Sequence, residues 1–123
     1  MSKIKHIAIF SEDPDRLAQF YVDVFGMRIT HTMKGSEESG DAVFITDGYV
    51  DVALIRPNEA DFPRGINHFG FTLDAADRSE ILGRLKERGI EPRTPPRDRP
   101  YVEDAIYDID GNKVDLSTTG MRI

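Results

Sequence analysis

The sequence contains no cysteine, and none of its apolar runs approaches the length needed to span a membrane. Without cysteine the chain can form neither a disulfide nor a thiolate metal ligand, and it has no thiol nucleophile. Any bound metal must therefore be held by histidine, aspartate, glutamate, water or substrate. The short N-terminal apolar run leads at once into acidic residues, unlike a secretory signal peptide. We therefore expect a cytoplasmic protein without membrane contact.

Positive charge is also scarce. The chain has 16 lysine and arginine residues against 22 aspartate and glutamate residues, which gives a net charge of −6. No basic cluster offsets this balance, so the electrostatic footprint of a nucleic-acid binder is absent. We expect small molecules or other protein chains as partners. At 123 residues with 39% hydrophobic side chains, the chain is long enough for one domain with its own core.

The sequence repeats itself at low similarity. "HIAIFSEDPDR" begins at His6 and "HFGFTLDAADR" begins at His68, 62 residues later, and both end in Asp-Arg. A second "DG" pair, at 110–111, follows the first, at 47–48, by 63 residues, and each pair precedes an apolar run. We therefore predict one domain over residues 1–123, built of module one (1–57), a linker (58–65) and module two (66–123).

Each module has the pattern of a strand, a helix and further strands. Asp13 and Pro14 precede apolar positions with helical spacing that end at Gly26, which predicts a helix with defined ends. Asp74 and Gly89 bound a shorter stripe of the same kind in module two. Strand-like runs follow each helix: "MRITHTM", "DAVFITD" and "YVDVALI" in module one, then an ill-defined stretch at 90–94, "VEDAIYDI" and "KVDLS" in module two. The prediction is an α+β fold of two βαβββ modules.

Two loops complete this layout. "KGSEESGD", at 34–41, is predicted to join two strands as a hairpin loop. The proline-rich "EPRTPPRDRPY", at 91–101, is predicted to be a loop or edge segment, with a lid over a site as the alternative.

The modules, with "NHFGFTL" opening the second and "DIDGNKVDL" closing it, resemble the vicinal oxygen chelate superfamily. It includes glyoxalase I, extradiol dioxygenases, methylmalonyl-CoA epimerase, fosfomycin thiol transferases and bleomycin-binding proteins. The family's closing motif usually reads Asp-Pro-Asp-Gly-Asn, two residues and Glu; here Ile109 replaces the proline and Asp115 the glutamate. The resemblance implies a curved mixed sheet around a cavity. It also implies a metal held from three strands that carry His6, His68 and Asp115 in this chain.

Side-chain alternation along the strands supports the same three residues. In both first strands the large apolar side chains should face the helix, which leaves His6 and His68 on the other face. The small residues Ala8 and Gly70 lie beside them on that face and leave room for a metal and its ligand. A lone histidine in such a place is more often a packing residue. Two at equivalent positions, together with Asp115, favour a metal site.

Two imidazoles and a carboxylate leave coordination positions open, which suits Fe, Mn, Ni or Zn as the divalent ion. Such an ion would act as a Lewis acid on a small substrate that chelates through oxygen. The sequence leaves open whether the reaction is that of a dioxygenase, lyase, isomerase or transferase. The fourth protein ligand of glyoxalases falls at Ala53, or at Asp51 if the register is one pleat earlier, and the tyrosine of extradiol enzymes falls at Ala105.

Other residues are candidates only. Tyr107 and Asp51 are the catalytic candidates, and His31 is expected to be an exposed edge-strand residue. Three arginines could bind an anionic substrate, although the default expectation is that they are solvated charges of a loop and the tail. They are Arg97, Arg99 and Arg122.

Two alternatives to an enzyme remain at this point. The first is a metal-free binding protein resembling bleomycin resistance proteins, in which Asp51 and Tyr107 meet a cationic ligand. The second is a regulatory module whose site has decayed. The family resemblance also implies a homodimer, whose site forms within one chain or across the interface.

Overall fold

A computed structural model of the chain describes residues 2–35, 40–93 and 104–117. It divides into two compact units, one of residues 6–67 and one that begins at His68 and also takes the first residues of the chain. The tip of the predicted hairpin loop at 36–39 lies outside the described residues. So do most of the proline-rich segment, Arg97, Arg99 and Arg122.

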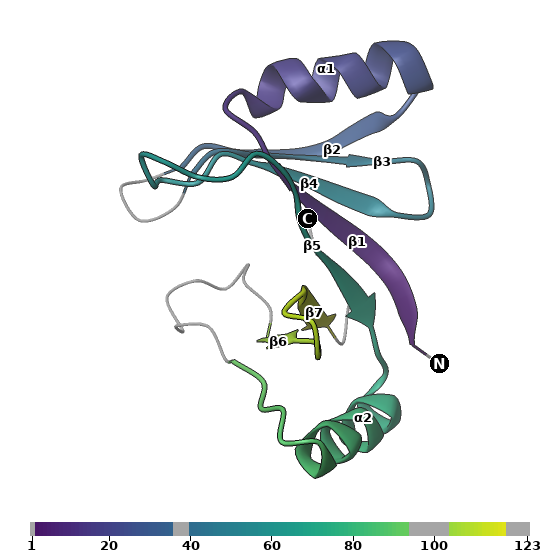
Figure 1. Cartoon of the computed structure of the whole chain (residues 1–123). Coiled ribbons are helices and arrows are strands. Elements are labelled where there is room, and N and C mark those ends of the chain that lie inside the picture. Colours follow the sequence, from purple (N-terminus) through teal and green to yellow (C-terminus); the bar gives the residue numbers. More distant parts are fainter. Residues whose placement is uncertain (1, 36–39, 94–103, 118–123) are drawn as a thin grey trace. The chain divides into compact units, whose positions relative to one another are not determined.

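The first unit contains one helix and four strands (Figure 1). The strands are β1 (Lys3–Phe10), β2 (Arg28–Met33), β3 (Ala42–Thr46) and β4 (Asp51–Ile55), and the helix is α1 (Pro14–Phe25). Their order in the sheet is β2-β3-β4-β1. β1 pairs with β4 in parallel, whereas the other two pairs are antiparallel. The sheet is therefore mixed, as the βαβββ pattern predicts.

Local signals set the ends of α1. The Asp13 side chain accepts a hydrogen bond from the backbone N–H of Arg16 at 3.1 Å, which satisfies a donor that the helix start leaves free. Gly26 ends the helix with a φ of +72°, a conformation that glycine adopts without a Cβ penalty. The predicted boundaries of this helix are confirmed.

The second unit repeats the arrangement. It contains β5 (Gly65–Thr72), α2 (Ala75–Glu87), β6 (Asp104–Tyr107) and β7 (Lys113–Ser117). The strand order is β5-β7-β6, with β5 and β7 parallel and β6 and β7 antiparallel. A single antiparallel bridge from Arg93 to Ala105 lies beyond β6, where the first unit has β2. Over the described residues 90–93, the ill-defined strand expected at 90–94 is represented by this one bridge, beside Pro92, which has no N–H to donate; residue 94 lies outside the described residues.

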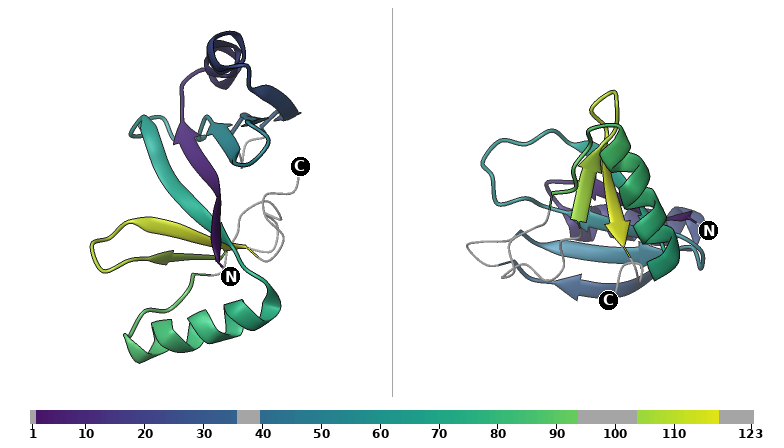
Figure 2. Two further views of the ribbon diagram at one scale, coloured as in Figure 1. Left: turned by 90° about the vertical axis from the view of Figure 1, so that its right-hand side faces the viewer. Right: turned by 90° about the horizontal axis from the view of Figure 1, so that it is seen from below.

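Both helices cover the face of the sheet that the alternation pattern predicts. Between α1 and the sheet the core contains Ala18 of the helix and Val43, Ile45 and Leu54 of the strands, with Ile9 packed against them. Under α2, which lies along the β6–β7 hairpin (Figure 2), the core residues are Leu73, Ile106, Val114 and Leu116, with Phe69 and Phe71 packed against them. The α+β class is therefore confirmed. Among the described residues, no helix is long and apolar enough to cross a membrane.

Candidate metal centre

His68 and Asp115 meet on the face of the second unit that α2 does not cover. The Nε2 atom of His68 lies 3.0 Å from the Oδ2 atom of Asp115. The two side chains are only 11% and 9% exposed. Parallel pairing of β5 with β7 places Gly70 opposite Asp115, so His68 lies one pleat before it on the same face. The strand register itself brings the imidazole and the carboxylate together.

Small residues flank Asp115 on both sides. Gly70 on β5 and Ala105 on β6 are its cross-strand partners. A glycine and an alanine leave the carboxylate without a large neighbour on either strand. Because a buried carboxylate is costly unless it is paired or binds a cation, such a place demands a positive partner. The imidazole of His68 lies against the carboxylate, and a metal ion would supply the positive charge.

The separation of the two atoms fits a shared metal ion. Ligand atoms that each lie roughly 2.1 Å from a metal, at a right angle to each other, are about 3.0 Å apart. The distance between His68 Nε2 and Asp115 Oδ2 has this value. Imidazole and carboxylate are also the ligands that Fe(II), Mn(II), Ni(II) and Zn(II) accept in open sites. The residues present therefore fit the group that the sequence predicts.

His6 belongs to the first unit. Its side chain is buried, with 3% exposed, on the face of β1 that α1 does not cover. Asp51 on β4 is its cross-strand partner. His6 therefore has the strand position and sheet face in its unit that His68 has in the other, and the catalytic candidate Asp51 lies next to it on the sheet.

Strand register decides where a fourth ligand would belong. Ala8 pairs with Ala53 in the first unit in the way that Gly70 pairs with Asp115 in the second. Ala53 thus holds the position equivalent to Asp115, and a methyl group cannot bind a metal. Asp51 lies one pleat earlier, at the position equivalent to Lys113.

Two further predicted residues have defined surroundings. His31 lies on β2, the edge strand of the first unit, where it is exposed with its ring centroid 6.0 Å from that of Phe44, as predicted. Tyr107 is 40% exposed, and the Arg93 guanidinium lies over its ring, 4.7 Å from the centroid. Sequence reasoning overlooked Arg93, since its place depends on the bridge to Ala105. It also overlooked Lys113, although alternation from Asp115 puts Lys113 on the same face.

The closing motif forms a tight loop between β6 and β7. Asp108 accepts hydrogen bonds from the backbone N–H groups of Asn112, at 2.8 Å, and Asp110, at 2.9 Å. The backbone N–H and side-chain amide of Asn112 are the main reasons why the pKa of Asp108 is lowered. Asp108 therefore organises the turn that starts β7 and does not belong to the metal centre.

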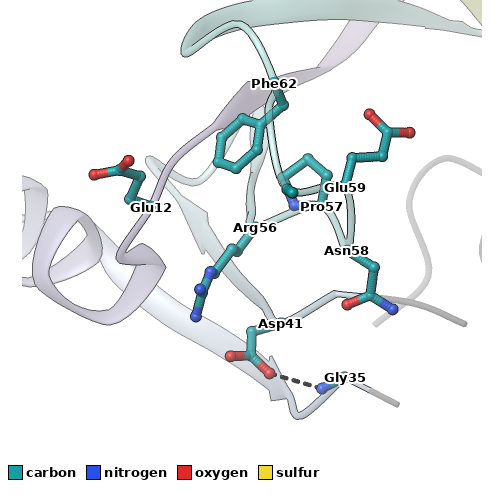
Figure 3. Close-up of a pocket in the computed structure, with 9 residues that line it drawn as sticks. Glu12, Gly35, Asp41, Arg56, Pro57, Asn58, Glu59 and Phe62 are labelled. Carbon is teal, nitrogen blue, oxygen red and sulfur yellow. Dashed lines mark hydrogen bonds between the residues drawn. The ribbon is translucent and has the colours of Figure 1, made fainter. Parts of the chain in front are cut away.

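The first unit also contains a polar pocket of about 540 Å³, at the ends of β1 and β4 (Figure 3). Arg56 and Asp41 lie on one side of it, and Asp41 accepts a hydrogen bond from the Gly35 N–H at 2.8 Å. None of the residues predicted for the metal site lines this pocket.

Comparison with known proteins places the chain in a family. The model of the Glyoxalase/Bleomycin resistance protein/Dioxygenase superfamily matches residues 3–116. Biphenyl-2,3-diol 1,2-dioxygenase 3 of Rhodococcus globerulus is 26% identical, in an alignment that covers 93% of this chain and 62% of that enzyme. The chain thus spans less than two thirds of that relative's length.

Solved structures with the same fold include enzymes. A methylmalonyl-CoA epimerase of Streptomyces coelicolor matches with a TM-score of 0.66 and 18% identity, over 98% of both chains. A hypothetical protein of Bacillus halodurans C-125 matches with a TM-score of 0.68 and 17% identity, over 94% of this chain and 92% of the other. At these identities the likeness shows the fold alone. Together with the family match, it shows that this chain belongs to the glyoxalase/bleomycin resistance protein/dioxygenase superfamily.

Proposed function

We propose that the protein is a divalent-metal-dependent enzyme that acts on a small, oxygen-chelating substrate, with His6, His68 and Asp115 as metal ligands. The observation that carries this proposal is the buried His68–Asp115 pair, whose donor atoms are 3.0 Å apart. When bound, the metal would supply Lewis-acid stabilisation of negative charge on substrate oxygens. His6 is included because it is the repeat equivalent of His68 and is buried, with 3% of its surface exposed.

The other groups on these faces supply the proton chemistry in this proposal. Ala53 removes the carboxylate that could act as a fourth ligand or as a base. A base must therefore come from elsewhere, and Asp51, the cross-strand partner of His6, is the candidate. The phenol of Tyr107 is the candidate hydrogen-bond donor to substrate. The Arg93 guanidinium lies over the Tyr107 ring, 4.7 Å from its centroid.

Metal content tests the proposal directly. Chelator-stripped, tag-free protein is offered Fe(II), Mn(II), Ni(II) or Zn(II) separately, desalted and subjected to elemental analysis. We expect the parent protein to retain close to stoichiometric metal. His6→Ala and His68→Ala should lose it, because each removes an imidazole ligand.

His31→Ala is the matched control, since it removes the third histidine, which is exposed on an edge strand. It should retain metal like the parent protein. A parent protein that binds none of the four ions would overturn the proposal and favour the metal-free binding protein. Metal loss in the His68 variant but not in the His6 variant would remove His6 from the ligand set.

We also propose that the protein is a homodimer, as the family resemblance implies. β2 is an edge strand whose residues are mostly exposed, so it offers backbone groups that a second copy could cover. Sedimentation equilibrium at micromolar concentration should give twice the chain mass. The chain mass alone would contradict the dimer without affecting the metal proposal.

A further inference from the structure

Two basic side chains share a sheet face with the His68–Asp115 pair. Lys113 lies two residues before Asp115 on β7, and its cross-strand partner is Tyr107 on β6. Arg93 is the bridge partner of Ala105, which in turn pairs with Asp115. Since directly opposed residues point to the same side of a sheet, all of these side chains lie on the face that α2 leaves uncovered.

Within the part of the chain that the structure describes, Arg93 is held in place without an acidic partner. Its backbone exchanges hydrogen bonds with Ala105 at 2.7 and 3.0 Å, and its guanidinium lies over the Tyr107 ring at 4.7 Å. Among the residues that the structure describes, no carboxylate forms an ion pair with Arg93 or with Lys113. By contrast, Arg78, beneath the opposite face, is paired with Asp104.

This arrangement points to a negatively charged ligand. The chain carries a net charge of −6, so an anion is repelled by the protein as a whole and needs local positive charge. A stacked guanidinium keeps its planar fork of donors free for carboxylate or phosphate oxygens. Lys113 adds a second cation. It is half-buried on β7, which lies between β5 and β6.

The strand register also gives the approximate distance between the proposed metal position and the two basic side chains. Continuing the β5–β7 pairing places His68 level with Lys113, which is level with Tyr107 on β6. Two strand spacings of about 4.8 Å separate His68 from Tyr107, hence roughly 10 Å between their Cα atoms. A ligand that chelates a metal at His68 could therefore place a second group, a few bonds away, against Arg93.

We propose that Arg93 and Lys113, with Tyr107 as the stacking support, form an oxyanion subsite, and that the substrate carries a carboxylate, phosphate or phosphonate group. As a substrate subsite it rests on the proposed metal-dependent function. As an anion-binding site it needs no metal, so it is tested on the metal-free protein.

The test is an NMR titration of the whole metal-free chain with inorganic phosphate and, separately, with malonate. Binding should shift the backbone amide signals of Arg93, Ala105 and Lys113. Arg93→Gln and Lys113→Gln should each weaken binding by at least about tenfold, as expected for loss of a charge-assisted hydrogen bond. Tyr107→Leu should also weaken it, whereas Tyr107→Phe keeps the ring and should bind nearly as well as the parent.

Arg88→Gln is the matched control, because Arg88 is exposed at the end of α2, which packs on the other face of the sheet. It should bind both probes like the parent. Preference for phosphate or for malonate identifies the oxyanion. Equal binding by the parent and Arg93→Gln, or shifts confined to α2, would overturn the subsite. Metal analysis of the same samples separates the two proposals, since anion binding through Arg93 in a chain that takes no metal would overturn only the proposed function.

Discussion

At the scale of single residues, the carboxylate of Asp115 is the most informative departure from the family pattern. The family usually has glutamate here, one methylene longer. The cross-strand neighbours Gly70 and Ala105 are small, so a longer side chain meets no bulky group on either strand. The family motif picks out Asp115 in the sequence, and strand alternation predicts that it lies on the same sheet face as His68. The sequence does not reveal these neighbours, because pairing between strands depends on tertiary structure.

Asp115→Glu should therefore retain stoichiometric metal, whereas Asp115→Asn should lose it. The glutamate keeps the charged ligand and has space to adapt. The amide keeps the shape but removes the negative charge, and metal affinity should fall by more than about tenfold. Competition with a chromogenic chelator measures both affinities. Equal affinities of the asparagine variant and the parent protein would exclude Asp115 as a ligand.

Asp108 allows a test of the closing motif by pH. The N–H groups of Asn112 favour the charged carboxylate, so the pKa of Asp108 lies below its ordinary value of 3.8. Because the folded pKa is lowered, the stability that Asp108 contributes is present above the unfolded value and is lost as pH falls through the folded one. NMR titration should show this low pKa, and Asn112→Ala should raise it. A pKa at or above 3.8 in the parent protein would contradict the turn geometry.

At the scale of elements, helices were predictable to within two residues because their signals are local. Asp13 and Asp74 each accept a hydrogen bond from the N–H three residues later, and a glycine with positive φ follows each helix. The sequence predicts an ill-defined strand at 90–94, but it does not show that Arg93 pairs with Ala105, since one bridge is decided by a distant partner. The part of Arg93 in the proposed oxyanion subsite was therefore not predictable, whereas alternation from Asp115 could have placed Lys113.

Two glycines give a matched test of this local logic. Gly26 has a φ of +72°, so Gly26→Ala should destabilise the fold by about 1 kcal/mol. Gly83 is exposed within α2, and an added Cβ there meets no described atom within 4 Å. Gly83→Ala should therefore stabilise by roughly 0.5–1 kcal/mol through helix propensity. Urea denaturation measures both, and changes of the same sign would contradict the assignment of these two positions.

At the scale of the whole molecule, the repeat in the sequence predicted the repeated unit in the structure, because the same apolar pattern builds the same core twice. The repeat does not make the two units chemically equal. Equivalent positions carry Ala53 in one and Asp115 in the other, so at this position the second unit has a carboxylate and the first has a methyl group. The carboxylate of the proposed ligand set therefore comes from the second unit.

The proposed ligand set of His6, His68 and Asp115 predicts which strands a bound metal protects. A ligand that binds only the folded protein stabilises it by about 2.7 kcal/mol at a free concentration a hundredfold above its Kd. Hydrogen exchange with and without metal should therefore show slower exchange in both β1 and β5. In His6→Ala this added protection should vanish from both strands, while His31→Ala should behave like the parent. Protection limited to β5 and β7 would mean that His68 and Asp115 bind the ion without His6.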